Sequence, residues 1–277
     1  MEPTAEAIGA LADWLRTGQV LVLSGAGLST DSGIPDYRGP TAVRRTRGPM
    51  TYKELLSGPT AQRRYWARSF LGWPKMRAAQ PNRGHLALAR LEELGLVRSV
   101  ITQNVDRLHT KAGTRDLVEL HGALHEVRCL GCQAQTPRDR VQERLAELNP
   151  AFFRDHLEVH PDGDAELGAE ETADFVLADC EACGGVLKPN VVFFGENVPA
   201  DVTKAAFERL DSARALFVVG SSLTVFSGYR FVRRAKEQQK PVAILNLGPT
   251  RGDAEATLRL DALQAPTLDG VLAHLGP

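Results

Sequence analysis

Residues 19–27 read Gln19-Val-Leu-Val-Leu-Ser-Gly-Ala-Gly27, and this stretch decides the fold. The apolar run is typical of a buried β-strand, and a turn of small residues follows it at once. Backbone N–H groups in such a turn lie open to an anionic group, because glycine carries no side chain to cover them. The stretch therefore predicts a strand that leads into a loop suited to phosphate.

The same pattern, a predicted strand followed at once by a polar or glycine-containing loop, recurs along the chain. Helical patterns separate the predicted strands, so strand and helix alternate as in a doubly wound parallel sheet. Such sheets bind ligands at the carboxyl ends of their strands. We expect an α/β fold, a Rossmann-like parallel sheet with helices on both faces. The further strands are predicted at 96–102, 213–219 and 242–245, the loops after them are Gln103-Asn-Val-Asp106, Gly220-Ser-Ser222 and Asn246-Leu-Gly248, and the helices are predicted at 4–16, 83–94 and 201–210.

All four cysteines of the chain lie in two Cys-x-x-Cys motifs, Cys129-Leu-Gly-Cys132 and Cys180-Glu-Ala-Cys183, which are separated by 47 residues. Four thiolates in two such turns suit the tetrahedral geometry of Zn²⁺. Buried or redox-active cysteines are the alternative. A site with four protein ligands has no open position, so we expect one structural zinc ion.

Two stretches interrupt the alternation of strands and helices. Residues 41–83 contain turns rich in Arg and Pro and a predicted helix at 62–71, and residues 128–186 contain the cysteines. Between Asp155 and Glu181 there are ten Asp or Glu and no Lys or Arg, which favours an exposed or mobile loop over a binding surface. We predict a single domain over 1–277 with two lobes. The large lobe comprises about 1–40, 84–127 and 187–277, and the small lobe comprises the helical insert 41–83 and the zinc module 128–186.

The charges nearly cancel, with 33 Lys and Arg against 34 Asp and Glu and a net charge of −1. This balance gives no general attraction to nucleic acids or anionic membranes. No apolar run approaches the ~20 residues that span a bilayer. The acidic N-terminus resembles neither a secretory signal nor a transit peptide. We expect a cytoplasmic monomer with no nucleic-acid or membrane partner.

The loop after Gly27 departs from the dinucleotide fingerprint, because the third glycine is absent. It continues as Asp31-Ser-Gly-Ile-Pro-Asp-Tyr-Arg38, which suits a flap that closes over a charged ligand, although a plain surface loop is the alternative. His121 and His125 have the spacing of a metal pair, but residue 122 is Gly where a zinc protease needs Glu. We discount that metal pair.

Together these motifs resemble the sirtuins, which are NAD-dependent protein lysine deacylases. Three more motifs are similar to the class II sirtuins, the branch that includes lipoamidase-type and desuccinylase-type enzymes. The general motifs are Gly25-Ala-Gly-Leu-Ser29, Gly33-Ile-Pro-Asp-Tyr-Arg38, Thr102-Gln-Asn-Val-Asp106, Leu120-His-Gly122, the paired Cys-x-x-Cys turns, Lys188-Pro-Asn-Val-Val-Phe-Phe-Gly-Glu196, Gly220-Ser-Ser-Leu223 and Asn246, and the class II motifs are Tyr65-Trp-Ala-Arg68, His109-Thr-Lys-Ala-Gly113 and Gly228-Tyr-Arg230.

The resemblance implies a role for each matching residue. His121 is the expected general base, since imidazole titrates near neutrality, with Asn104 and Asp106 beside it in the nicotinamide pocket. Tyr65 and Arg68 lie three apart on a predicted helix and are expected to hold an acyl carboxylate, unless Tyr65 is core and Arg68 surface. The expected NAD-binding residues are Gly25, Ala26, Gly27, Ser29, Thr30, Asp36, Tyr37, Arg38, Gln103, Asn104, Val105, Asp106, Gly220, Ser221, Ser222, Asn246, Leu247, Gly248 and Gln264, and the expected peptide-binding residues are Val192, Phe193, Phe194, Gly195, Glu196, Ser227, Gly228 and Tyr229.

The implied reaction moves an acyl group from lysine to ADP-ribose, which releases nicotinamide, 2′-O-acyl-ADP-ribose and free lysine. Two alternatives remain at this point. A mono-ADP-ribosyltransferase on the same scaffold would leave the ribosyl group on protein. A non-enzymatic zinc-bearing interaction module would bind a partner without consuming NAD, but it has no need of polar residues at four strand ends.

Overall fold

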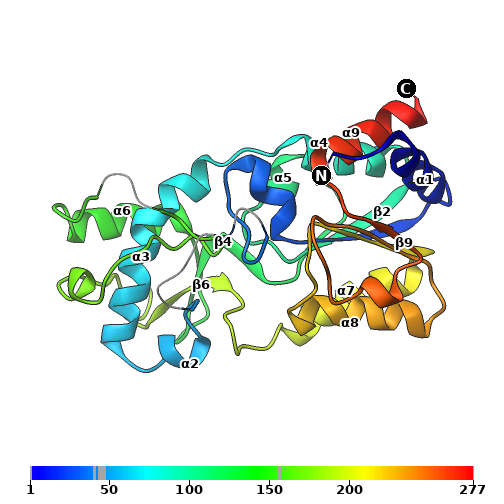
Figure 1. The fold of residues 1–277 in the computed structure, drawn as a ribbon. Coiled ribbons are helices and arrows are strands. Elements are labelled where there is room, and N and C mark those ends of the chain that lie inside the picture. The colour runs from blue at the N-terminus through cyan, green and yellow to red at the C-terminus, as the bar shows by residue number, and fades with distance from the viewer. Residues whose placement is uncertain (1, 40–41, 43–47, 155–157, 277) are drawn as a thin grey trace.

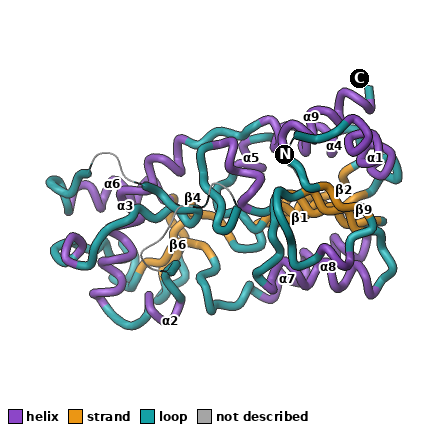
Figure 2. The backbone as a smooth tube through the Cα atoms, in the orientation of Figure 1, coloured by secondary structure: helices purple, strands orange, loops and turns teal. Residues whose placement is uncertain are grey.

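The computed structural model describes residues 2–39, 42, 48–154 and 158–276, and it has two lobes side by side (Figure 1). The remaining residues, at 1, 40–41, 43–47, 155–157 and 277, fall within the predicted lobes and lie outside the described residues. Figure 2 shows that the larger lobe contains a stack of strands with helices above and below it. The smaller lobe contains more loop and a second group of strands.

The large lobe is built on a six-stranded parallel sheet in the order β3-β2-β1-β7-β8-β9. Its central strands are buried on both faces, which explains why they read as continuous apolar runs in the sequence. This confirms the predicted parallel Rossmann-like sheet. The strands are β1 (Val20–Ser24), β2 (Val97–Thr102), β3 (Leu117–Glu119), β7 (Ala215–Val219), β8 (Val242–Leu245) and β9 (Leu258–Leu260).

Helices cover both faces of this sheet (Figure 1). Helices α1, α4 and α9 pack on one face around Leu88 and Phe217, and helices α7 and α8 pack on the other around Phe231. Thr4 begins the first helix, since its hydroxyl accepts a hydrogen bond from the N–H of Ala7 at 3.1 Å. The helices are α1 (Ala5–Leu15), α4 (Arg83–Glu93), α7 (Ala200–Ser212), α8 (Phe226–Glu237) and α9 (Gln264–Leu275).

The strand order reverses between β1 and β7, and the loops after these strands are joined there. The N–H of Gly25 donates to the carbonyl of Val219 at 3.0 Å, and the N–H of Gly27 donates to the carbonyl of Gly220 at 2.8 Å. Gly220 has a φ of +62°, and a Cβ there would collide with the N–H of Leu28. A crevice forms where strand order reverses in such sheets, so this point is where a ligand is expected.

The small lobe contains a second, antiparallel sheet in the order β5-β4-β6. This differs from the predicted boundaries, which placed 122–127 and 187–191 in the large lobe. The reason is that β4 and β6 are irregularly buried and pair across more than fifty residues, so no local pattern marks them. The strands are β4 (Gly122–Cys129), β5 (Gln135–Pro137) and β6 (Leu187–Val191), and the helices of this lobe are α2 (Tyr52–Leu55), α3 (Pro59–Ala78) and α6 (Arg138–Leu148).

Helix α3 is longer at both ends than the helix predicted at 62–71, and it continues through Pro74. Its buried side chains join the small-lobe core, where Tyr65 and Trp66 pack with Phe175 and Phe193. Among the described residues, no helix is both long enough and apolar enough to cross a membrane.

Two buried histidines meet beneath the loops of the large lobe. His85 on α4 and His109 on α5 (Leu108–Lys111) are 0% and 1% exposed, and their ring centroids are 5.1 Å apart. His109 Nε2 lies 2.8 Å from Ser24 Oγ at the end of β1. Burial lowers the pKa of His109 to about 4 and holds the pKa of His85 well below its usual range. Both rings are therefore neutral in the folded protein at pH 7.

We expect the protein to lose stability as the pH falls below 6.5. The unfolded chain then binds protons on His85 and His109 that the folded protein does not bind. Since the pKa of His109 falls from 6.5 to about 4, His109 alone contributes a loss of about 3 kcal/mol in the free energy of unfolding, complete near pH 4. Urea unfolding between pH 7.5 and 4.5 measures this, and His109→Gln should flatten the profile. A wild-type profile that is level from 6.5 to 5 would contradict it.

Candidate active site

A cavity of about 1240 Å³ lies at the carboxyl ends of the large sheet and is lined by residues of both lobes. All nineteen of the expected NAD-binding residues line it, and so does His121. Of the expected substrate residues, Tyr65, Ser227 and the run Val192–Glu196 line it as well. Arg68, Gly228 and Tyr229 are not among its lining residues. The structure thus gathers residues from four strand ends, as the parallel sheet predicts.

The loop after β2 is tied to the loop after β1 by buried polar side chains. Asn104 Nδ2 donates to the carbonyl of Gly25 and to Ser29 Oγ, both at 3.0 Å. Ser29 Oγ in turn donates to Asp106 Oδ2 at 2.7 Å. Burial raises the pKa of Asp106, while hydrogen bonds from Leu108 and Ser29 oppose that shift. These contacts hold Asn104 and Asp106 at fixed positions in the cavity wall.

Gln103, in the loop after β2, contacts both the end of β1 and the loop after β7. Its Nε2 donates to Ser221 Oγ at 2.8 Å, and its backbone N–H donates to the carbonyl of Ser24 at 3.0 Å. Gly228 packs against the Gln103 side chain, because a Cβ at residue 228 would collide with Gln103 Oε1. Gly228 thus lies beside the end of the Gln103 side chain, and it is not among the residues that line the cavity.

The imidazole of His121 has a defined orientation in the cavity. Its Nδ1 lies 2.8 Å from the carbonyl of Gln103, and since a carbonyl only accepts, Nδ1 carries the proton. Its Nε2 is then the basic nitrogen and lies 2.8 Å from Ser227 Oγ, which donates to it. Burial lowers the pKa of His121, with the Gln103 carbonyl opposing that shift and Arg230 adding to it. The ring is neutral at pH 7 and can accept a proton at Nε2.

Tyr65 and Arg68 share a face of α3 but point to different surroundings. Tyr65 is 3% exposed and lines the cavity, where its ring packs edge-on against Phe193 at 5.4 Å. Arg68 is 4% exposed, and its Nε donates to the carbonyl of Ala165 at 2.9 Å. Arg68 is therefore neither a surface residue nor a residue of the cavity wall, and the pair does not meet as the spacing predicts.

Tyr229, which was expected to bind peptide, is also engaged elsewhere. Its hydroxyl donates to Glu255 at 2.8 Å, and the guanidinium of Arg251 lies 4.2 Å from its ring centroid. The neighbouring Ser227 does line the cavity and contacts His121, so the two ends of this short segment face different surroundings.

The acidic segment supplies cavity residues that sequence reasoning missed. Pro161, Asp162 and Asp164 line the cavity, and Asp164 is 2% exposed. The expectation of an exposed or mobile loop is wrong for this part of the segment, although residues 155–157 lie outside the described residues. The acidic composition led to a wrong prediction of exposure, because a short turn can be buried when its charged side chains pair with nearby groups. Pro161 and Gly163 are the turn signals that could have marked it.

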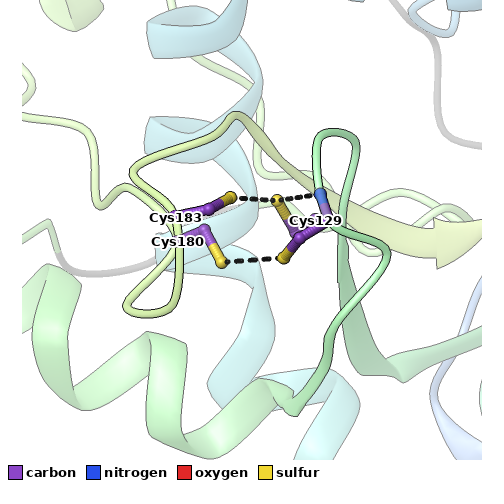
Figure 3. Close-up of side chains that lie close together, drawn as sticks. Cys129, Cys180 and Cys183 are labelled. Atoms are coloured by element: carbon purple, nitrogen blue, oxygen red, sulfur yellow. Dashed lines mark hydrogen bonds between the residues drawn. The ribbon is translucent and has the colours of Figure 1, made fainter.

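The four cysteines meet in the small lobe, where Cys180 and Cys183 in one turn face Cys129 in the other (Figure 3). Their Sγ atoms all lie within 4.8 Å of one another, with Cys129 to Cys183 at 3.5 Å and Cys132 to Cys180 at 3.7 Å. A disulfide would need about 2.05 Å. A tetrahedron of sulfurs at 2.3 Å from Zn²⁺ has edges of about 3.8 Å, so the cluster fits zinc.

The backbone of the first turn favours a thiolate. The N–H of Cys132 and the N–H of Gly131 donate to Cys129 Sγ at 3.5 and 3.3 Å. These hydrogen bonds lower the pKa of Cys129 to about 6, and the hydrogen bond from the Cys132 N–H contributes most. Both turns also pack directly on the small-lobe core through Cys129 and Cys180.

The strand order reverses at the cavity, which is the arrangement of dinucleotide-binding α/β proteins. The four-cysteine cluster adds a module with the geometry of a metal site. The model of the Sir2 family matches residues 25–227 of the chain. "NAD-dependent protein deacetylase 1" of Streptomyces coelicolor is 49% identical over 276 residues, which cover 100% of this chain and 92% of the relative. The chain belongs to the Sir2 family, which confirms the resemblance to sirtuins.

Two further comparisons agree. The mitochondrial "NAD-dependent protein lipoamidase sirtuin-4" of Bos taurus is 48% identical over 247 residues, which cover 88% of this chain and 78% of that relative. A solved structure described as "Sir2-p53 peptide-NAD+" superposes with a TM-score of 0.77 at 32% identity, covering 96% of this chain and 97% of that chain.

Proposed function

We propose that this protein is an NAD-dependent protein lysine deacylase, which transfers the acyl group of an acyl-lysine to ADP-ribose and releases nicotinamide. The observation that carries the proposal is the neutral His121, whose basic Nε2 faces a cavity at the reversal point of the sheet. The deacetylase and lipoamidase names of the relatives support it.

The cavity fits NAD together with an acyl-lysine. At about 1240 Å³ it exceeds the 300–1,000 Å³ typical of small-molecule sites, which leaves room for two ligands. Ser221 and Ser222 contribute hydroxyls beside Gly25 and Gly27. The N–H groups of those two glycines already bond to Val219 and Gly220, so the glycines bring the two loops together, and Ser221 and Ser222 remain as side-chain donors for the pyrophosphate.

NAD supplies an ADP-ribosyl group whose bond to nicotinamide breaks as the acyl oxygen of the substrate takes its place. His121 would then accept a proton at Nε2 from the ribose diol, which lets a ribose hydroxyl attack the acyl carbon. Water would hydrolyse the resulting adduct, which releases the lysine amine and leaves the acyl group on ADP-ribose. The Gln103 carbonyl favours the resulting imidazolium, because the hydrogen bond that it accepts from Nδ1 is stronger when the ring is charged. Asn104 and Asp106, held by Ser29, shape the wall near the departing nicotinamide.

The substrate peptide lies along the residues that follow β6 in this proposal. Val192 donates its N–H to the carbonyl of His121 at 2.9 Å, so the segment that follows β6 begins beside the residue that carries the base. An extended peptide added there gains main-chain hydrogen bonds with little dependence on its sequence. Phe194 is 38% exposed at this rim and offers an apolar contact.

We also propose that Cys129, Cys132, Cys180 and Cys183 hold one structural Zn²⁺ ion. The near-tetrahedral spacing of their sulfurs supports this. Four protein ligands close the site, so its contribution is to the stability of the small lobe.

The experiment that tests the proposed activity is the release of nicotinamide from NAD with and without an acetyl-lysine peptide. We expect release only when the acetylated peptide is present, because the acyl oxygen is the group that displaces nicotinamide. The same peptide with unmodified lysine is the matched control. Binding of NAD without any consumption, across a panel of acyl-lysine peptides, would contradict the proposal and favour an interaction module.

A further inference from the structure

Asp261 follows the edge strand β9 directly and lines the cavity, although no sequence motif marks it. The residue is exposed, and its Oδ1 accepts a hydrogen bond from the N–H of Gly248 at 2.8 Å. This bond ties Asp261 to the loop after β8. Among the residues that the structure describes, no group donates to Oδ2. One oxygen of the carboxylate is therefore anchored, and the other can accept from a ligand in the cavity.

The order of the strands places Asp261 and His121 at opposite ends of the cavity. Strands β3 and β2 lie on one side of the reversal point between β1 and β7, and β8 and β9 lie on the other. His121 comes soon after β3, whereas Asp261 comes directly after β9. A dinucleotide binds across such a sheet at the reversal point. Its nicotinamide half reacts beside His121 in the proposed function, so its adenosine half lies over β8 and β9.

Arg259, on β9, holds the loop after β8 in a fixed shape. Its Nη1 donates to the carbonyl of Asn246 at 3.0 Å, its Nη2 donates to the carbonyl of Gly248, and its Nε donates to Asp253 Oδ1 at 2.8 Å. Arg259 is not among the residues that line the cavity. Its guanidinium is bonded to this loop, so it does not offer its charge to a phosphate beside Asp261.

The two cations that line the cavity, Arg38 and Arg230, belong to its other parts. Arg230 Nε donates to the carbonyl of Ser227 at 3.1 Å, and Ser227 contacts His121. Arg38 follows Tyr37, whose ring packs edge-on against an aromatic ring of the segment after β6 in the small lobe. No other Lys or Arg of the described residues lines the cavity. Its adenosine end thus has a carboxylate without a lining cation.

This distribution of charge distinguishes between the two nicotinamide dinucleotides. NAD has a hydroxyl on the 2′ carbon of the adenosine ribose, and NADP has a phosphate there. A carboxylate accepts hydrogen bonds from the ribose hydroxyls of NAD, whereas a nearby arginine accommodates the 2′-phosphate of NADP. A carboxylate and a phosphate in a confined site repel each other. The carboxylate of Asp261 is therefore suited to NAD and opposes NADP.

We propose that Asp261 is the residue that selects NAD over NADP, with its Oδ2 accepting a hydrogen bond from a hydroxyl of the adenosine ribose. The inference rests on the proposed NAD-dependent function. It extends the dinucleotide site to the edge strand β9, with Arg259 as the residue that positions the loop on which Asp261 is anchored.

The test measures the affinities for NAD and for NADP by calorimetric titration. We expect the wild-type protein to bind NAD at least about tenfold more tightly than NADP, because of the repulsion at the 2′-phosphate. Asp261→Asn removes the charge and keeps an oxygen for the Gly248 N–H. It should raise the affinity for NADP by about fivefold or more and lower that for NAD by about threefold. Asp201→Asn, an exposed acid on α7 that does not line the cavity, is the matched control and should change neither affinity.

Equal affinities of the wild-type protein for the two dinucleotides, or an unchanged ratio in Asp261→Asn, would overturn the proposal. An equal loss of both affinities in Asp261→Asn would overturn it too, since that result would make Asp261 a residue of loop shape alone. A gain in NADP affinity is a result that damage to the fold does not produce. The titrations need no turnover, so the expected ratios in a protein that never releases nicotinamide would support this inference while the deacylase function fails.

Discussion

Replacing His121 with alanine should lower the rate of deacylation by about 10³-fold or more, the range that a positioned general base supplies. The reason is that His121 Nε2 is the basic nitrogen at the cavity, with its tautomer set by the Gln103 carbonyl. NAD affinity should stay within about threefold, since His121 is one of many lining residues. Steady-state rates on an acetyl-lysine peptide and calorimetric titration with NAD measure the two effects.

His274→Ala is the matched control for this substitution, because His274 is exposed on α9 and does not line the cavity. It should leave both the rate and the NAD affinity unchanged. Turnover by His121→Ala at the wild-type rate would show that another group takes the proton, and the catalytic assignment would fail.

Removal of the metal should unfold the small lobe and abolish activity with it. Cys129 and Cys180 belong to the same core as Tyr65 and Phe193, which line the cavity. Structural zinc contributes about 10–16 kcal/mol in small zinc-folded peptides, so a loss of about 5 kcal/mol or more in the free energy of unfolding is expected here. Urea unfolding with and without a strong chelator, together with the metal content by mass spectrometry, measures it.

The matched variants for the metal site are Cys183→Ser, which removes one thiolate, and Ala182→Ser, which alters the same exposed turn without touching a ligand. Only Cys183→Ser should lose metal and stability, and added zinc should restore the chelated wild type. A protein that is purified without metal and remains equally stable in chelator would contradict a structural zinc site.

The large sheet could be predicted from the sequence because its signals are local. The run Val20–Ser24 is buried on both faces and therefore apolar throughout, and the glycines after it mark the loop. The antiparallel sheet of β4, β5 and β6 could not be predicted, because its strands are short or irregular and find partners far along the chain. Expectations of a monomer, of a cytoplasmic location and of no nucleic-acid partner stay predictions.

The cavity residues divide in the same way. His121 and the glycine loops lie at strand ends, where position along the chain translates directly into position at the sheet edge. Arg68 shows the limit of this reasoning. Helix spacing places it on the same face as Tyr65, but it does not reveal that the guanidinium donates a hydrogen bond to the carbonyl of Ala165. The partner is 97 residues away, and the close approach of Gly163 to Gly72 brings that part of the chain onto α3.

The destination of the acyl group separates a deacylase, which moves it from lysine to ADP-ribose, from an ADP-ribosyltransferase. The most direct measurement is mass spectrometry of all products after incubation with NAD and an acetyl-lysine peptide. We expect equal amounts of nicotinamide, free-lysine peptide and 2′-O-acetyl-ADP-ribose. Peptide or protein that gains the mass of ADP-ribose and keeps its acetyl group would contradict it and identify an ADP-ribosyltransferase instead.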